Sequence, residues 1–362
     1  MFDTNIKKHL DNAYKQFNQP GFIPNDPISI PHKFTKKEDI EIAGFISATL
    51  AWGNRKAIIS SANKFMDLME NSPADFIANH SEKERQNFSN FVYRTFQTDD
   101  ALGFLASLQN IYKNLGGLEN IFTESFAKGG AFEAINHFHE TFFSVPMMQR
   151  TRKHVAYPAG GSAAKRINMY LRWMVRDDEN GVDFGLWKKI DKKELMCPLD
   201  VHSGNSARKI GLLTRKQNDW KAVVELTENL KLYDKNDPVK YDFALFGMGV
   251  EKIDFKIEII MKKGVAIDYD FEKGAKILLF GHDLCSTCGA VYDSLSSRIP
   301  EDIEFVYIDT VETPALSGRF GVFTAPVVTF MLDGKEYKRW VRHFGINEIL
   351  EYTQRIMDIY NS

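Results

Sequence analysis

Two cysteines separated by two residues form the clearest reactive pattern in the sequence. Cys285 and Cys288 stand between an apolar run at residues 276–280 and a stretch with helical spacing. Near the N-terminus of a helix the dipole can hold Cys285 as a thiolate, and Cys288, one turn later, can resolve a mixed disulfide. Half of a zinc site is the alternative, although no second Cys/His pair at ligand spacing accompanies the thiols. The pattern therefore favours thiol–disulfide exchange, with no metal and no cofactor.

A lysine and an aspartate form the second candidate site. Lys165 opens a helical pattern after a turn of small residues that contains Gly160 and Gly161. Asp200 follows a proline-containing turn and precedes another helical pattern, so its carboxylate can cap the backbone N–H groups of that helix. An amine nucleophile beside a carboxylate suits Schiff-base chemistry. The alternative is structural, because aspartate caps are common and helical lysines are usually solvated.

The neighbourhood of these two residues is locally basic. A tight glycine-rich turn that opens a helix leaves backbone N–H groups pointing outward, which suits a phosphate. Lysines and arginines recur on both sides of the turn. The formal net charge of the whole chain is only −2. Nucleic-acid binding would therefore depend on such a local surface and not on overall charge.

Length and composition predict two packed domains. The chain has 362 residues, of which 44% are hydrophobic, which is more than one average domain needs. Its three cysteines allow at most one internal disulfide and lack the four thiolates of an all-cysteine iron–sulfur site. The N-terminus has no apolar signal core, and no uncharged run approaches the ~20 residues that span a bilayer. We therefore expect a cytoplasmic protein without membrane contact.

Hydrophobic periodicity divides the chain into a helical part and a mixed part. Residues 1–255 are predicted to be an all-α domain, residues 256–263 a linker, and residues 264–362 an α/β domain. The run at 40–50 is apolar nearly all round, which is typical of a buried helix. The helical stretches expected in the first part are 5–17, 35–50, 58–69, 76–78, 91–96, 102–115, 121–126, 132–143, 164–175, 220–232 and 238–249. The second part is expected to contain strands at 276–280, 304–308 and 327–331 and a closing helix at 347–359.

The sequence around Asp200 reads Pro198-Leu-Asp-Val-His202 and continues as Ala207-Arg-Lys-Ile-Gly-Leu212. It resembles a cap and helix of the helix-hairpin-helix DNA glycosylase superfamily, which includes endonuclease III and the 8-oxoguanine glycosylases. The turn 158–165 would then be the hairpin. The stretch 42–54 would be the early helix, whose end carries the residue that fills the gap left by a flipped base. Residues 1–255 as a whole resemble an uncharacterised bacterial family of unknown function, common in Bacteroidetes and related to these glycosylases.

This resemblance implies a DNA-repair activity of the glycosylase or abasic-site lyase type, acting on double-stranded DNA with a damaged base or an abasic site. Lys165 would attack C1′ of the damaged nucleotide, displace the base and form an imine, while Asp200 would stabilise the developing positive charge or assist proton transfer. The target must first leave the base stack, so Trp52 or Asn54 would hold the gap; core packing is the alternative for Trp52. Lys153 is the rival nucleophile, and a non-catalytic DNA-binding module is the alternative function. The other residues expected at the nucleic-acid surface are Arg150, Arg152, Lys153, Gly160, Gly161, Arg166 and His202.

Residues 264–362 carry further markers around the two cysteines. The Cys285-Ser-Thr-Cys288 motif is followed by Phe323-Thr-Ala-Pro-Val-Val-Thr-Phe330 and by Asp333-Gly334. Together these segments resemble the thioredoxin family. The resemblance implies a thioredoxin-like fold in which Pro326 is a cis residue packed beside the thiols, and it implies a protein disulfide substrate or a reductase as partner. The sequence departs from the family at Leu279, where a buried proton-accepting aspartate often lies.

Overall fold

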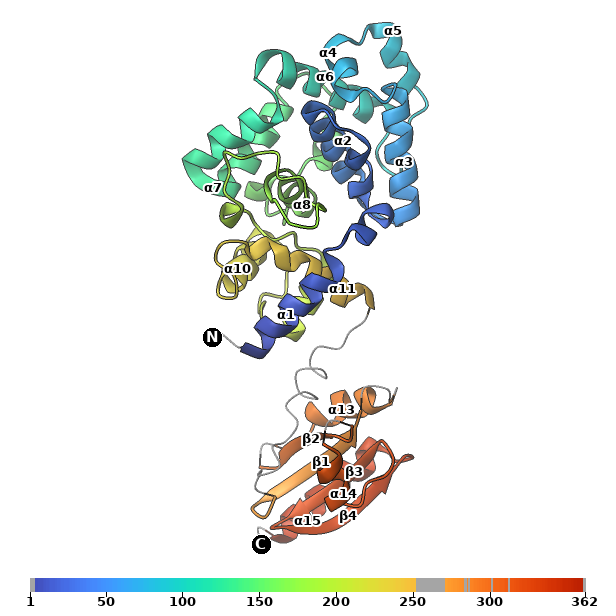
Figure 1. The fold of residues 1–362 in the computed structure, drawn as a ribbon, viewed down its shortest axis with the longest axis vertical. Coiled ribbons are helices and arrows are strands. Elements are labelled where there is room, and N and C mark those ends of the chain that lie inside the picture. The colour runs from blue at the N-terminus through green and yellow to red at the C-terminus, as the bar shows by residue number, and fades with distance from the viewer. Residues whose placement is uncertain are drawn as a thin grey trace. The chain divides into compact units, whose positions relative to one another are not determined.

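Two compact units make up the chain, Met1–Lys252 and Ile253–Ser362 (Figure 1). The computed structural model describes residues 4–251, 271–282, 285, 287–300, 302–311 and 313–360. The linker expected at residues 256–263 lies outside these described residues. Within the described ranges, no helix is long and apolar enough to cross a membrane.

The described part of the first unit is helical, as its periodicity predicts. Short 3₁₀ turns connect the helices, and β-bridges occur there as isolated pairs such as Ser162 with Asp219. The helices are α1 (Thr4–Phe17), α2 (Lys37–Leu50), α3 (Arg55–Leu68), α4 (Pro73–Asn79), α5 (Glu82–Arg85), α6 (Thr98–Asn114), α7 (Leu118–Phe142), α8 (Lys165–Val175), α9 (Val201–Lys209), α10 (Trp220–Lys231) and α11 (Tyr241–Glu251).

Helix α2 contributes the centre of an aromatic core. Every residue from Ile40 to Leu50 is buried, which confirms the prediction made from the continuous apolar run. The ring of Phe45 stacks on Phe104 of α6 and meets Tyr170 of α8, each at a centroid distance of 5.8 Å. Such ring pairs add to the free energy of burial. Helix α8 is thereby held against α2 in the middle of the unit (Figure 1), and this contact fixes the place of its first residue, Lys165.

Helix α7 is broken where two glycines follow one another. Gly129 has φ −164° and Gly130 has φ 65° and ψ −159°, and neither pair of angles is helical. Gly130 lies in a region of backbone conformation that essentially glycine alone adopts. The sequence prediction of separate helices at 121–126 and 132–143 is therefore confirmed.

One predicted helix is absent from the described chain. Residues 91–96 form a tight turn in which Tyr93 and Phe96 exchange two backbone hydrogen bonds, and Arg94 has a left-handed φ of 54°. The rings of Phe91 and Phe96 both pack on Phe65 of α3. The helix prediction was wrong. A turn can bury these aromatic side chains in the core as well as a helix can, so their apolar pattern does not distinguish the two.

The second unit contains a mixed sheet with helices. The described strands are ordered β2-β1-β3-β4, with β1 parallel to β2 and antiparallel to β3, and with β3 antiparallel to β4. The three predicted strands are present, and β4 follows the predicted turn at Asp333 and Gly334. The elements are β1 (Ala275–Gly281), α13 (Cys288–Ser296), β2 (Glu304–Asp309), α14 (Pro314–Arg319), β3 (Val327–Leu332), β4 (Lys335–Val341) and α15 (Ile346–Tyr360).

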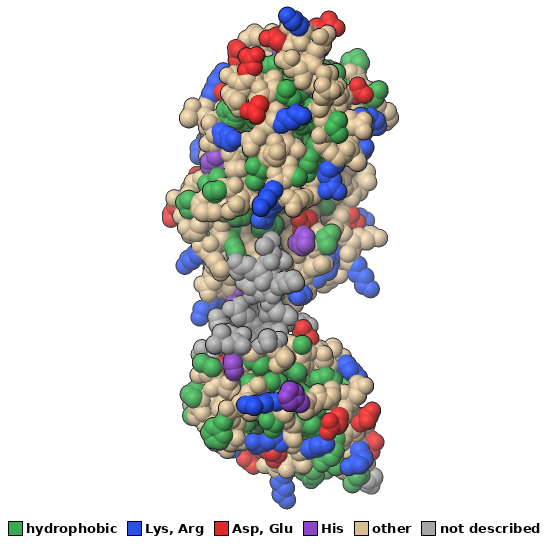
Figure 2. Space-filling view, turned by 90° about the vertical axis from the view of Figure 1, so that its right-hand side faces the viewer, with side chains coloured by type: hydrophobic (Ala, Val, Ile, Leu, Met, Phe, Trp, Pro, Cys, Tyr) green, Lys and Arg blue, Asp and Glu red, His purple; other side chains and the backbone are tan. Residues whose placement is uncertain are grey.

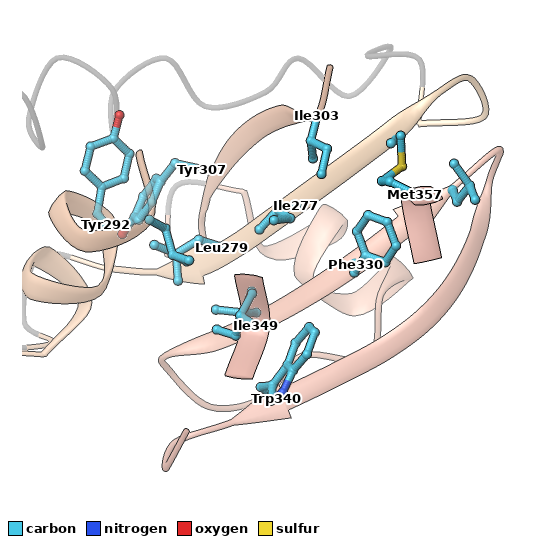
Figure 3. Close-up of a cluster of buried hydrophobic side chains, with 13 residues drawn as sticks. Ile277, Leu279, Tyr292, Ile303, Tyr307, Phe330, Trp340, Ile349 and Met357 are labelled. Atoms are coloured by element: carbon cyan, nitrogen blue, oxygen red, sulfur yellow. The ribbon is translucent and has the colours of Figure 1, made fainter. Parts of the chain in front are cut away.

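The sheet buries both of its faces. Alternate residues of β1 point to opposite sides, as the pleat requires. Ile277 and Leu279 belong to a cluster that includes Ile349 and Met357 of α15, which Figure 3 shows gathered on one side of the strands. The intervening side chains of β1 pack with α14 on the other face. All of β1 is buried, up to its last residue, Gly281. The segment with the two cysteines follows directly after this end of the strand.

Candidate functional site

Asp200 and Lys165 meet where two helices begin. The Oδ1 atom of Asp200 accepts hydrogen bonds from the backbone N–H groups of His202 and Ser203 at 2.8 and 2.9 Å, and so caps α9. Its Oδ2 atom lies 3.1 Å from Nζ of Lys165, the first residue of α8. Burial raises the pKa of Asp200, but the Lys165 ammonium and the N–H of Ser203 outweigh burial and hold that pKa below its usual range. An ammonium and a carboxylate therefore face each other, both partly exposed.

This ion pair lines a cleft with a volume of about 520 Å³. A smaller neighbouring cavity of about 40 Å³ also has Lys165 and Asp200 in its wall. The cleft combines polar groups with aromatic and aliphatic side chains, which is typical of a ligand site. Its other lining residues are Asp26, Pro27, Ala51, Trp52, Gly53, Arg55, Ile58, Arg166, Met169, His202 and Phe246.

Trp52 lies at the wall of this cleft and is half-buried. Its ring stacks on His154 at a centroid distance of 5.8 Å and meets Tyr93 edge-on at 5.1 Å. The Arg166 guanidinium also lies over the Trp52 ring, 5.0 Å from its centroid. Trp52 is therefore held by three neighbours while part of its surface remains accessible. The three ring contacts fit the expected role of a core residue, and the accessible part of the side chain fits the expected role of a wedge.

Several predicted DNA contacts lie away from the cleft lining. Asn54 caps α3, because its Oδ1 accepts from the backbone N–H groups of Lys56 and Ala57. Arg150 pairs with the buried Asp100 at 3.0 Å, and Arg152 lies over the ring of Phe143. Lys153 is exposed on the same 3₁₀ turn (Gln149–His154). Of the predicted set, Trp52, Arg166 and His202 line the cleft with Lys165 and Asp200.

The glycine turn before α8 does not present open amide groups. The N–H of Gly160 donates to the carbonyl of Tyr157, and the N–H of Gly161 donates to that of Pro158. The expectation that these amides point outward to a phosphate was wrong, since a 3₁₀ turn satisfies both of them internally. Arg166 is also engaged, as it donates to the carbonyl of Thr49. Burial lowers the pKa of Arg166 to about 10, so it remains a cation at neutral pH.

The charged side chains of the first unit do not form a continuous basic patch on the face drawn in Figure 2. Lysines and arginines there are scattered among neutral side chains.

Behind the cleft, buried Arg172 donates to Asp183 at 3.3 Å and also to Asp242. Burial raises the pKa of Asp242 to about 6, although Arg172 acts in the opposite direction. The inner wall of the smaller cavity thus holds paired charges.

Phe246, Arg55 and Met169 are among the cleft residues that the sequence does not mark as functional. Phe246 lies in the apolar α11, where it is indistinguishable from a core residue, and Arg55 follows Asn54 without any motif. The Arg55 guanidinium lies 4.6 Å from the centroid of the Phe246 ring. Met169, one helical turn after Lys165, completes this side of the cleft. Only the packing of α3, α8 and α11 brings these residues together.

In the second unit, Cys285 and Cys288 are joined by a disulfide. Cys288 is the first residue of α13 and is buried, whereas Cys285 is half-exposed. The Sγ of Cys285 lies 3.6 Å from the hydroxyl of Thr287. The pair therefore offers one accessible sulfur and one shielded sulfur at a helix N-terminus. Within the described ranges, no group of three or more histidine, cysteine or acidic side chains is arranged to hold a metal ion.

Pro326 lies at the same end of the sheet as the disulfide. The bond between Ala325 and Pro326 is cis. The last pair of the ladder between β1 and β3 joins Phe280 with Val327, the residue that follows Pro326. A side chain at Gly281 would lie only 3.0 Å from Sγ of Cys288. Pro326 and Cys288 therefore both lie close to the end of β1.

The C-terminal region is thioredoxin-like. It is 28% identical over 78 residues to "Thioredoxin-like protein YdfQ" of Bacillus subtilis (strain 168), a match that covers 21% of this chain and 70% of that protein. Among solved structures, thioredoxin 1 of Thermosipho africanus TCF52B is 33% identical and covers 24% of this chain and 99% of its own, with a TM-score of 0.23. A mutant thioredoxin of Halobacterium salinarum NRC-1 is 19% identical and covers 23% of this chain and 74% of its own, with a TM-score of 0.22.

The helical part identifies the family of the chain. Residues 26–251 match the family described as "Protein of unknown function (DUF2400)". This match covers more than half of the chain, and the protein belongs to that family. The description names no activity, so the relationship to helix-hairpin-helix DNA glycosylases and the roles of Lys165 and Asp200 remain predictions.

Proposed function

We propose that the second unit is a thiol–disulfide oxidoreductase whose reactive residues are Cys285 and Cys288. The observation that carries the proposal is their disulfide at the start of α13, with Cys285 half-exposed and Cys288 buried. This asymmetry suits exchange, because the attacking sulfur must be reached by the target while the resolving sulfur is shielded. The sequence similarity of this region to a thioredoxin-like protein supports the same chemistry.

The exchange takes two steps. The Cys285 thiolate attacks one sulfur of a target disulfide, which forms a mixed disulfide and releases the other target sulfur as a thiolate. The Cys288 thiolate then attacks Sγ of Cys285, the bond to the target breaks, and the second target sulfur leaves as a thiolate. The target gains two electrons, and the cysteine pair returns to the disulfide. A dithiol reductant regenerates the reduced pair, and the same steps in reverse oxidise a target dithiol.

Reduction of insulin disulfides by the full chain in the presence of dithiothreitol tests this function. We expect turnover above the uncatalysed rate in the wild type and loss of turnover in Cys285→Ser. Cys197→Ala is the matched control, since Cys197 is a buried free thiol in the first unit, and it should keep full turnover. An absence of exchange in the folded wild type would remove the proposal.

A separate observation favours a second activity for the first unit. The Nζ atom of Lys165 lies 3.1 Å from Asp200 in the cleft that also contains Trp52 and Phe246. We infer that this cleft receives an extruded nucleotide of damaged or abasic DNA and that Lys165 is the nucleophile. After its proton passes through the Asp200 carboxylate to water, the neutral amine adds to C1′ of an opened abasic sugar, and loss of water leaves an imine. Elimination of the 3′ phosphate from that imine would complete a lyase reaction.

Borohydride trapping on DNA with an abasic site tests the lysine. Reduction of the imine should crosslink the wild-type chain to DNA, and Lys165→Ala should lose the crosslink but still bind. Lys153→Ala is the comparison for the rival lysine, because Lys153 is exposed and lies outside the cleft lining. Undiminished trapping by Lys165→Ala would exclude Lys165 as the nucleophile. Salt-sensitive binding without trapping or base release would favour a non-catalytic DNA-binding module.

A further inference from the structure

A tyrosine hydroxyl and the buried cysteine sulfur border the same small space at the last residue of β1. A Cβ atom at Gly281 would lie 2.5 Å from the hydroxyl oxygen of Tyr307 and 3.0 Å from Sγ of Cys288. Glycine at this position leaves that space free of a side chain.

The sheet register directs Tyr307 toward this place. Tyr307 of β2 pairs with Leu279 of β1 across the parallel ladder, so both side chains project from the same face. Figure 3 shows the two side by side, with Tyr292 of α13 next to them. The Tyr292 and Tyr307 rings are 6.0 Å apart and meet edge-on. The hydroxyl of Tyr307 is therefore presented toward α13, the helix that Cys288 begins.

The Cys288 sulfur and the two side chains that border it at the end of β1 are buried. Cys288, Leu279 and Tyr307 are exposed by only 1%, 0% and 3% of their surface. A thiolate buried among apolar atoms is costly unless a donor hydrogen-bonds to it. Leu279 has no side-chain polar atom with which to provide that bond. The hydroxyl of Tyr307 is the side-chain donor that borders the space at Gly281 together with this sulfur.

We propose that Tyr307 donates a hydrogen bond to the Cys288 thiolate during exchange. This inference rests on the thiol–disulfide exchange proposed above and specifies how its second step occurs. The Cys288 thiol gives its proton to water, and its thiolate, held by the Tyr307 O–H, attacks Sγ of Cys285. The bond between Cys285 and the target sulfur breaks, and the target leaves as a thiolate that takes a proton from water. The phenol keeps its own proton throughout.

The same hydrogen bond acts when the disulfide is reduced. An incoming thiolate attacks Sγ of Cys285, the bond between the two cysteines breaks, and Cys288 leaves as the thiolate. A leaving thiol of lower pKa departs faster. Tyr307 therefore assists both directions of exchange, because each passes through the Cys288 thiolate.

The test compares Tyr307→Phe with wild type in the full chain, using two measurements. The first is the rate at which dithiothreitol reduces the disulfide. The second is the pH midpoint for alkylation of Cys288 in the reduced chain, resolved by mass spectrometry. We expect about a tenfold slower reduction and a midpoint about one pH unit higher, the size expected for one hydrogen bond to a charged group. A purely structural role would not raise the midpoint.

Tyr292→Phe is the matched control, because it removes a hydroxyl from the neighbouring buried tyrosine of the same cluster. It should keep the wild-type midpoint. An unchanged midpoint in Tyr307→Phe, or equal shifts in both variants, would overturn the inference. If Tyr307→Phe does not fold, Gly281→Ala should raise the midpoint instead, since its methyl group would lie 2.5 Å from the hydroxyl oxygen and force that oxygen to shift. The two proposals can also fail separately. If the wild type does not exchange with targets but its Cys288 midpoint still depends on Tyr307, the proposed function is wrong and the inferred hydrogen bond is supported.

Discussion

The two oxygens of Asp200 have different tasks, and substitutions can separate them. Oδ1 caps α9 through two backbone N–H groups, and Oδ2 faces Lys165. Asp200→Asn keeps a capping oxygen but removes the charge, whereas Asp200→Ala removes both. We expect Asp200→Ala to lower the free energy of unfolding by ~1 kcal/mol and Asp200→Asn to change it much less. Urea unfolding at neutral pH measures the difference, and equal losses would show that the cap is not what Asp200 contributes.

Protonation of His154 should destabilise the chain in mild acid. Burial lowers the pKa of His154 from 6.5 to about 4, against the attraction of Asp100. The unfolded chain therefore binds this proton near pH 6.5, while the folded chain binds it only near pH 4. The stabilisation is complete above the higher value and is lost as the pH falls toward the lower one. Burial of His80 and His139 lowers their pKa values too, with the same sign.

We therefore expect the free energy of unfolding to be smaller near pH 5 than near pH 7, with each pKa unit worth about 1.4 kcal/mol. His154→Asn should reduce this pH dependence. His137→Gln is the control, because His137 is exposed, and it should leave the dependence as in the wild type. The interpretation fails if His154→Asn retains the full pH dependence.

At the residue scale, the sequence suggests candidate reactive side chains but does not show which distant residues contact them. The short patterns around Asp200 and Cys285 depend on local helix starts, which sequence reveals through caps and spacing. The engagement of Arg150 with Asp100 and of Arg166 with Thr49 joins residues far apart in the chain. No local pattern predicts such pairs. For that reason, positive charge near a site was a poor guide to which cations line the cleft.

The break in helix α7 depends on one residue, Gly130. Gly130 has a positive φ with ψ −159°, a conformation that costs other residues about 1–3 kcal/mol. Gly130→Ala should lower the free energy of unfolding by that amount, measured by thermal or urea unfolding. Gly21→Ala is the control, since Gly21 lacks a positive φ and a Cβ there would meet no atom within 4 Å. Equal stability of the two variants would mean that α7 can accommodate a continuous helix.

At the element scale, long periodic segments are predictable and short aromatic ones are not. The buried α2 and the three strands follow from continuous apolar runs, and the double glycine marks the break in α7. The turn at 91–96 has the same apolar composition as a short helix, and only its packing on Phe65 distinguishes them. The pairing of Tyr307 with Leu279, which orients the hydroxyl, depends on strand order and register. Neither can be read from one strand alone.

At the scale of the whole molecule, each unit has its own core, and this predicts separate responses to core mutations. Phe45 is fully buried in the first unit, and Phe330 is fully buried in the second. Phe45→Ala should destabilise the first unit by about 3–5 kcal/mol and leave insulin reduction unchanged. Phe330→Ala should abolish insulin reduction while the helical circular dichroism persists. Loss of insulin reduction in Phe45→Ala would show that the second unit depends on the first for its activity.

The membership of residues 26–251 in a family without a described activity means that function must come from the sites. The change in periodicity along the chain predicts a helical part and a mixed part, and the two compact units lie on either side of residue 252. Sequence alone gives no physical reason for joining a thioredoxin-like unit to the helical unit. The described parts of the two units contain two separate candidate sites, the ion pair of Lys165 with Asp200 and the disulfide of Cys285 with Cys288.

The most direct test of the account is the redox equilibrium of Cys285 and Cys288 in the full chain. The chain is equilibrated in glutathione buffers of graded reducing power, alkylated, and weighed by mass spectrometry. We expect both cysteines to become alkylated together, reversibly, in a single transition while the fold persists, and we expect Cys288→Ser to abolish this paired transition. A disulfide that opens only when the chain unfolds, or two thiols that are alkylated independently in every buffer, would contradict the account.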